Sequence, residues 1–182
     1  MLSALARRQL LEIARRAIEE RLRGDAPAPF GELPDELQRT SGAFVTLRRK
    51  HDRELRGCVG YVEPKHPLAQ TVALAAVAAA TNDSRFEPVA LEELSLLALD
   101  ISVLGPVFPI VASQVVIGRH GLVIEQAGCR GLLLPQVALE WGWDATTFLE
   151  QTCRKAGLPK SAWREQGAVL SAFEAELLNE ES

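Results

Sequence analysis

The stretch of sequence that decides the fold is residues 42–62, GAFVTLRRKHDRELRGCVGYV. β-prone residues fill its two ends, 42–47 and 54–62, and the charged run RRKHDR lies between them at 48–53. Two β-prone segments around a polar connection are typical of a β-hairpin. We therefore predict two antiparallel strands here, joined by an exposed turn.

Helices are predicted on both sides of this hairpin. Before it, apolar residues recur at helical spacing, Ser3 is a residue type that caps a helix start, and Gly24 is a type that ends one. After it, a second helix is predicted from residue 68 to about residue 80. This helix is so rich in alanine that a neighbouring element must approach it closely.

The rest of the chain alternates short β-prone segments with helical ones. The predicted strands cover residues 97–103, 115–117, 121–125, 129–134 and 169–177, and the predicted helices cover 136–141 and the segment between Asp144 and Gly157. Strands joined by short turns, with helices between groups of them, indicate an α+β fold with a largely antiparallel sheet flanked by helices. We expect one domain over residues 1–182, with a small lobe around residues 105–145.

Composition excludes several classes of protein. Of the 182 residues, 47% are hydrophobic and 24% are charged, which is a globular balance. The net charge of -4 offers no overall attraction for nucleic acid or an anionic membrane. No apolar run approaches the roughly 20 residues that span a bilayer, and the N-terminus lacks the order of a signal peptide. Because three cysteines cannot all pair with one another, we expect reduced thiols and a cytoplasmic location.

The candidate site centres on Arg56 and Cys58. In a strand, residues two apart point to the same side, so Arg56, Cys58 and Gly60 share one face. A nearby cation favours the thiolate, which is the reactive form of cysteine. Gly57 and Gly60 weaken a strand, and such glycines often mark the close approach of a ligand or of another backbone. The alternative is a buried structural Cys58, with Gly57 making room for the alanine-rich helix.

Three further residues are candidates for the same site. His120 lies between two glycines on a turn, where it would act as a base or orient a substrate near Cys58; the alternative is a histidine that hydrogen-bonds its own loop. Asp83 and Arg85 would supply a carboxylate and an anion clamp. The alternative for these two is an ion pair that fixes the loop after the helix.

Known cofactor and metal motifs are missing from the sequence. It contains no P-loop, no G-x-G-x-x-G, no H-E-x-x-H and no G-x-S-x-G. Three scattered histidines and three scattered cysteines give neither metal-ligand spacing nor the cysteine set of an iron–sulfur cluster. We therefore expect no metal and no cofactor in this chain.

Five motifs follow one another along the chain: LRGCVG at 55–60, DSRFEP at 83–88, GRHGL at 118–122, LPQVA with WGW at 134–143, and RKAG at 154–157. In this order they resemble the AMMECR-domain family, called AmmeMemoRadiSam system protein A in prokaryotes. The resemblance covers residues from about 42 to 175. It implies an α+β fold with a larger and a smaller subdomain, and an activity that is not established. It also implies partners, a Memo-like protein and a radical S-adenosylmethionine protein, in a shared pathway that modifies RNA or protein.

Three functional hypotheses follow. The first is a catalytic or substrate-handling component of a modification pathway. Its catalytic candidates are Cys58, Arg56 and His120, and its substrate-binding candidates are Gly57, Gly60, Asp83 and Arg85. The second is a non-catalytic adaptor that docks the Memo-like and radical S-adenosylmethionine proteins. The third, nucleic-acid binding, is disfavoured by the acidic balance. The sequence does not indicate whether the chain forms a homo-oligomer.

Overall fold

A computed structural model describes residues 1–63 and 65–180, which divide into two compact units. Unit 1 holds residues 1–104 together with the end of the chain from residue 176, and unit 2 holds residues 105–175. Strand β7 (Val169–Asn179) therefore contributes to both units. Unit 2 begins where the small lobe was expected and continues beyond residue 145, and the expectation of one domain stays a prediction.

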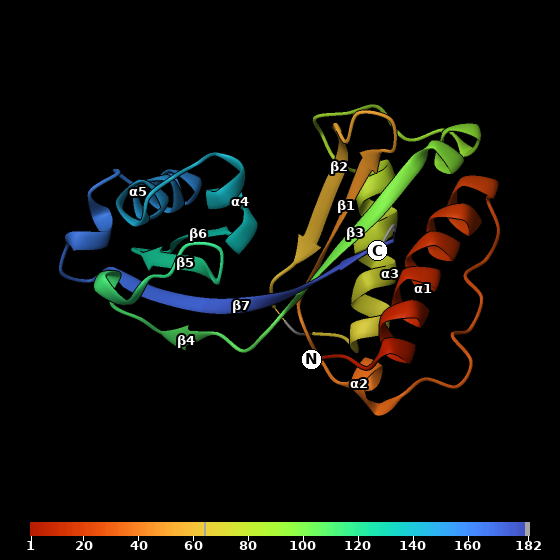
Figure 1. The fold of residues 1–182 in the computed structure, drawn as a ribbon, viewed down its shortest axis with the longest axis horizontal. Coiled ribbons are helices and arrows are strands. Elements are labelled where there is room, and N and C mark those ends of the chain that lie inside the picture. Colours follow the sequence, from red (N-terminus) through yellow and green to blue (C-terminus); the bar gives the residue numbers. More distant parts are fainter. Residues whose placement is uncertain (64, 181–182) are drawn as a thin grey trace. The chain divides into compact units, whose positions relative to one another are not determined.

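Unit 1 is a sheet covered on one face by two long helices (Figure 1). The strands are β1 (Ala43–Arg49), β2 (Leu55–Tyr61) and β3 (Leu97–Leu104), with β1 antiparallel to both neighbours. Helix α3 (Leu68–Thr81) lies against β1 and β2, and α1 (Ala4–Arg23) packs on α3. The short helix α2 (Asp35–Gln38) precedes β1, and the 3-10 helix η1 (Leu91–Leu96) precedes β3.

The predicted ends of α1 are confirmed. The Ser3 hydroxyl accepts a hydrogen bond from the backbone N–H of Ala6 at 3.3 Å, which satisfies one of the free donors at the helix start. Gly24 follows the helix with a φ of 79°, a backbone conformation that glycine adopts without strain. Leu10, Ile13 and Ile18 are buried, so the apolar stripe faces the core as its spacing predicts.

The hairpin of β1 and β2 is also confirmed, and its register orders the site. Thr46 lies opposite Cys58 and Phe44 lies opposite Gly60, so these four residues share one face of the sheet. Gly57 points to the other face, where a Cβ atom would overlap the carbonyl oxygen of Ala79 in α3. The interpretation that Gly57 makes room for the alanine-rich helix is therefore confirmed.

This contact generates a first prediction. Gly57→Ala is expected to lower the free energy of unfolding by about 2–3 kcal/mol, because the new methyl group meets rigid helix backbone rather than a movable side chain. Urea denaturation measures the loss. The control is Gly24→Ala, whose Cβ meets nothing within 4 Å and whose cost comes from its positive φ alone, about 1 kcal/mol. Equal losses in the two variants would show that the helix yields.

Unit 2 is a smaller antiparallel sheet with helices. Strand β5 (His120–Gln126) pairs antiparallel with β6 (Cys129–Leu133) and with β7, and β4 (Phe108–Pro109) also pairs with β7. Helix α5 (Ala145–Lys155) packs against β5 and β6, and α4 (Pro135–Glu140) precedes it. The remaining elements are the 3-10 helices η2 (Ala112–Gln114) and η3 (Ala162–Arg164). The full strand order is β2-β1-β3-β7-β5-β6, and the predicted α+β class with a largely antiparallel sheet is confirmed.

One predicted strand, at residues 115–117, is wrong. The 3-10 helix η2 ends just before this segment, Val115 and Val116 belong to no helix or strand, and the chain then turns through Gly118, whose φ is 82°. The carbonyl oxygen of Val116 accepts hydrogen bonds from the N–H groups of Arg119 and His120, at 3.2 and 3.0 Å. These local turn bonds outweigh the β-propensity of Val115, Val116 and Ile117.

In the part of the chain that the structure covers, no helix is both long enough and apolar enough to span a bilayer.

Candidate functional site

The thiol of Cys58 lies on the face of the unit 1 sheet that points away from α3. Its cross-strand neighbour Thr46 donates a hydrogen bond from Oγ1 to Sγ at 3.2 Å. The hydroxyl is buried, with 9% of Thr46 exposed, whereas Cys58 is half-buried. A hydroxyl donor at this distance stabilises negative charge on sulfur, and the thiolate is the form of cysteine that reacts.

The backbone of Cys58 is held by Asp83, which lies two residues after α3. Oδ2 of Asp83 accepts the N–H of Cys58 at 2.8 Å. β2 is an edge strand of the sheet. Because this N–H points away from β1, it needs a hydrogen-bond acceptor from outside the sheet. The Asp83 carboxylate supplies that partner, and only 6% of its side chain is exposed.

Asp83 also binds Arg85. The Arg85 guanidinium donates through Nε to Oδ1 at 2.9 Å and through Nη2 to Oδ2 at 2.7 Å, and its backbone N–H donates to Oδ1 at 3.1 Å. The Arg85 side-chain hydrogen bonds, helped by the N–H of Cys58, hold the pKa of Asp83 far below its ordinary value. Asp83 in turn raises the pKa of Arg85, and negative charge on Cys58 adds to this rise. The predicted pairing of Asp83 with Arg85 is therefore present.

Arg56 makes different contacts from those its strand position suggested. Its Nε and Nη2 donate to the carboxylate of Glu93 at 2.6 and 3.0 Å, and its Nη1 donates to the carbonyl oxygen of Glu87 at 2.9 Å. The ring of Phe86 lies near both arginines, with its centroid 5.9 Å from Arg56 and 5.5 Å from Arg85. Negative charge on Cys58 contributes to the raised pKa of Arg85, and a catalytic role for Arg56 stays a prediction.

The two glycines of the motif are approached closely by protein atoms. At Gly60 a Cβ atom would overlap the ring of Phe44 on β1, and at Gly57 it would overlap α3. Both glycines therefore have a packing reason for lacking a side chain. A substrate-binding role for either stays a prediction.

His120 belongs to unit 2, where it opens β5. Only 7% of the residue is exposed, and its Nδ1 accepts the N–H of Val116 at 3.2 Å. Its ring also meets Phe108 edge to face, at 5.8 Å between centroids. The structure thus shows a hydrogen bond between this histidine and its own loop, as the alternative interpretation held, while a catalytic role stays a prediction. It brings Cys58, Arg56, Asp83 and Arg85 together within unit 1.

Comparison with known proteins shows which family this chain belongs to. The AMMECR1 family model matches residues 11–178. The chain belongs to the AMMECR1 family. A protein of Methanothermobacter thermautotrophicus is 44% identical over 182 residues, covering 96% of this chain and 94% of the relative. A protein of Pyrococcus furiosus is 43% identical over 182 residues, covering 94% of this chain and 87% of the relative.

A solved structure shares the fold. The crystal structure of an uncharacterised protein from Pyrococcus horikoshii matches with a TM-score of 0.89 and 42% sequence identity. The match covers 94% of this chain and 90% of that protein. The resemblance inferred from the five motifs is therefore confirmed, and so is the fold that it implies.

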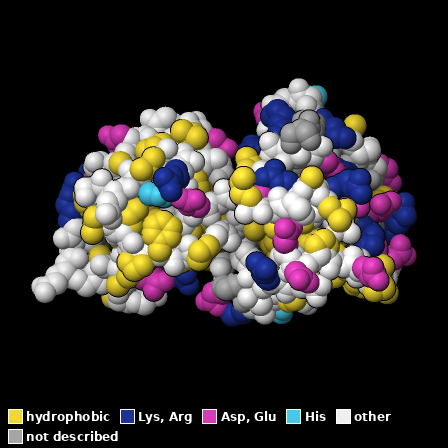
Figure 2. All heavy atoms as spheres, turned by 60° about the horizontal axis from the view of Figure 1, so that its bottom comes forward, with side chains coloured by type: hydrophobic (Ala, Val, Ile, Leu, Met, Phe, Trp, Pro, Cys, Tyr) yellow, Lys and Arg dark blue, Asp and Glu magenta, His cyan; other side chains and the backbone are white. Residues whose placement is uncertain are grey.

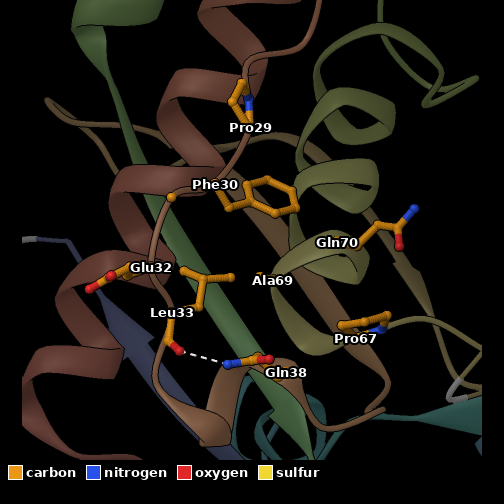
Figure 3. Close-up of a pocket in the computed structure, with 9 residues that line it drawn as sticks. Pro29, Phe30, Glu32, Leu33, Gln38, Pro67, Ala69 and Gln70 are labelled. Atoms are coloured by element: carbon orange, nitrogen blue, oxygen red, sulfur yellow. Dashed lines mark hydrogen bonds between the residues drawn. The ribbon is translucent and has the colours of Figure 1, made fainter.

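This AMMECR1-family protein also has a groove that the sequence did not indicate. The groove has a volume of about 790 Å³, and Phe30 and Leu33 point into it between α1 and α3 (Figure 3). Its lining residues are Pro29, Phe30, Gly31, Glu32, Leu33, Gln38, Pro67, Ala69 and Gln70. It lies at the first turn of α3, whereas Asp83 holds Cys58 beyond the last turn, about 20 Å away along a helix of this length. The groove and the Cys58 site are therefore separate places on unit 1.

The sequence analysis did not identify two residues of the site. Thr46 is a direct cross-strand neighbour of Cys58, but the register shifts by one residue between Leu47 and Arg48, so an even register drawn from the hairpin turn would have paired Thr46 with Gly57 instead. Glu93, which binds Arg56, lies 37 residues from its partner and carries no local signal. Among the residues that the structure describes, no three His, Cys, Asp or Glu side chains are grouped closely enough to hold a metal ion.

The buried carboxylate generates a second prediction. Because the folded pKa of Asp83 lies below its unfolded value, its contribution to stability is present above about pH 4 and is lost as the pH falls further. Asp83→Asn is expected to lower the free energy of unfolding by about 2 kcal/mol at pH 7. The difference from the wild type should shrink at pH 3, where urea unfolding remains measurable. A gap of equal size at both pH values would contradict this assignment, and Asp25→Asn, at an exposed carboxylate, is the control.

Proposed function

We propose that this protein handles a substrate at the thiol of Cys58, as a catalytic or substrate-handling component of a modification pathway. The observation that carries the proposal is the hydrogen bond from Thr46 Oγ1 to Cys58 Sγ at 3.2 Å. A buried hydroxyl aimed at a half-buried sulfur stabilises charge on a thiol that solvent can reach.

The surrounding contacts fit a site of this kind. Asp83 fixes the backbone of Cys58 and at the same time anchors the guanidinium of Arg85. A reacting group held by packed neighbours and hydrogen bonds keeps its geometry, which substrate handling requires. Arg56 donates a hydrogen bond to Glu93 and lies near the ring of Phe86, so it stabilises the loop that carries Asp83 and Arg85.

Membership of the AMMECR1 family supports the assignment of this activity to a pathway. We assign the protein to a cytoplasmic pathway shared with a Memo-like protein and a radical S-adenosylmethionine protein, which is what the resemblance of the motifs implies. In a mixture of the three proteins, Cys58→Ala would abolish turnover and Cys129→Ala would not, since Cys129 is an exposed thiol in unit 2.

Alkylation of the folded protein tests the proposal directly. With iodoacetamide and peptide mass mapping, Cys58 is expected to react faster than Cys129, although Cys129 is the more exposed thiol. Cys153 should stay unmodified until the protein is unfolded, because burial raises the pKa of its thiol. Thr46→Val, which keeps the side-chain shape and removes the hydroxyl, should slow the reaction of Cys58 about fivefold. Slow labelling of Cys58, equal in the wild type and in Thr46→Val, would refute an activated thiol.

A second candidate function, a docking adaptor, is favoured by a different observation. Leu139 and Trp141 on unit 2 are 61% and 69% exposed, and Val116 is 49% exposed. Trp141 stacks on Trp143 with 6.1 Å between ring centroids, so the two rings present a stiff apolar surface. On the face drawn in Figure 2, hydrophobic side chains lie at the surface of this unit, on the left, among polar ones. Exposed apolar surface of this kind is typical of protein–protein contact sites.

The adaptor has its own prediction. If unit 2 docks the Memo-like or the radical S-adenosylmethionine protein, Trp141→Ser should weaken capture of that purified partner at least tenfold, because exposed tryptophans often dominate binding energy. Leu96→Ser is the control, since Leu96 is 63% exposed on unit 1. Capture that survives Trp141→Ser would count against unit 2 as the docking surface.

A further inference from the structure

We infer that the substrate handled at Cys58 carries an anionic group, a carboxylate or a phosphate, which binds the guanidinium of Arg85. In this arrangement Asp83 is a positioning residue and does not contact the substrate. The inference rests on the proposed function of Cys58, because it names the chemistry recognised beside that thiol.

The carboxylate of Asp83 has no capacity left for a substrate. Its Oδ2 accepts from the N–H of Cys58 and from Nη2 of Arg85, and its Oδ1 accepts from Nε and the backbone N–H of Arg85. With 6% of its side chain exposed, it is also out of reach of solvent. Since one oxygen of Asp83 binds both residues, Asp83 sets the place of Arg85 relative to Cys58.

The guanidinium of Arg85 keeps a free edge. Asp83 takes Nε and Nη2, and among the described residues Nη1 has no hydrogen-bond partner. The side chain is 55% exposed, so that edge is open to solvent. A guanidinium is planar and presents N–H donors in fixed directions, which suits the oxygens of a carboxylate or a phosphate. Phe86 lies 5.5 Å from this guanidinium and restricts its movement.

The charge of Arg85 also has Cys58 among its neighbours. Negative charge on Cys58 is one of the causes that raise the pKa of Arg85, so the two charges lie close enough to interact. An anion bound at the free edge of Arg85 would therefore be held by a guanidinium that Oδ2 of Asp83 fixes next to Cys58. The protein as a whole carries a net charge of -4, so any preference for an anion at Cys58 has to come from a local group.

Two alkylating reagents of the same size isolate this preference. Iodoacetate and iodoacetamide both lose iodide to a thiolate, which forms a carbon–sulfur bond, and they differ in charge. The measurement is the ratio of the iodoacetate rate to the iodoacetamide rate at Cys58, taken relative to the same ratio at Cys129 in the same molecules. We expect the Cys58 ratio to be several-fold higher at low salt and to fall as salt is added.

Variants assign the effect to Arg85. Arg85→Gln should bring the ratio at Cys58 down to that at Cys129. Arg8→Gln, which removes an exposed arginine on α1, keeps the total charge of Arg85→Gln and should leave the ratio unchanged. Protection of Cys58 against iodoacetate by inorganic phosphate, compared with acetate at equal ionic strength, shows which anion the site prefers.

The outcomes separate the two proposals. Fast labelling of Cys58 by iodoacetamide with a ratio equal to that of Cys129, or a ratio that Arg85→Gln does not change, overturns the anion inference and leaves the proposed function standing. Failure of both reagents to label Cys58 in the folded protein overturns the proposed function, and the inference falls with it.

Discussion

The hydrogen bond from the Cys58 N–H to Asp83 is the interaction on which the site depends. An edge strand leaves alternate N–H groups without a partner, and here a buried carboxylate from the end of α3 takes one of them. The bond can form because Gly57 lets the last turns of α3 lie directly on β2. A side chain at Gly57 would lift the helix, and Asp83 would then move away from the strand edge.

The two glycines beside Cys58 have separate tasks. Gly57 admits α3 on one face of β2, and Gly60 admits the ring of Phe44 on the other. Each glycine weakens a strand by about 0.5–1 kcal/mol relative to alanine. The close packing that they allow offsets this cost and leaves Cys58 held between two fixed points of the backbone. The motif therefore has a sufficient packing explanation at its glycines.

The sequence predicted helices and strands better than it predicted which side chains contact one another. Helix α1 and the hairpin follow from local periodicity and turn residues, which act over a few positions. Strand alternation correctly separated the face of Cys58 from that of Gly57. It could not show that Arg56 binds Glu93, because alternation fixes a face and says nothing about a residue 37 positions away. The strand predicted at residues 115–117 was wrong for the opposite reason, since a local turn overrode the β-propensity of these residues.

The difference between the two arginines near Phe86 lies in which of their donors are occupied. Arg56 uses Nε, Nη1 and Nη2 on Glu93 and on the carbonyl of Glu87, and 15% of its side chain is exposed. Arg85 uses only Nε and Nη2 on Asp83, and 55% of its side chain is exposed. A guanidinium with all three nitrogens engaged stabilises a loop, whereas one with a free, solvent-facing nitrogen can bind a ligand without breaking a bond. Of the two, Arg85 is therefore the arginine whose geometry suits a substrate.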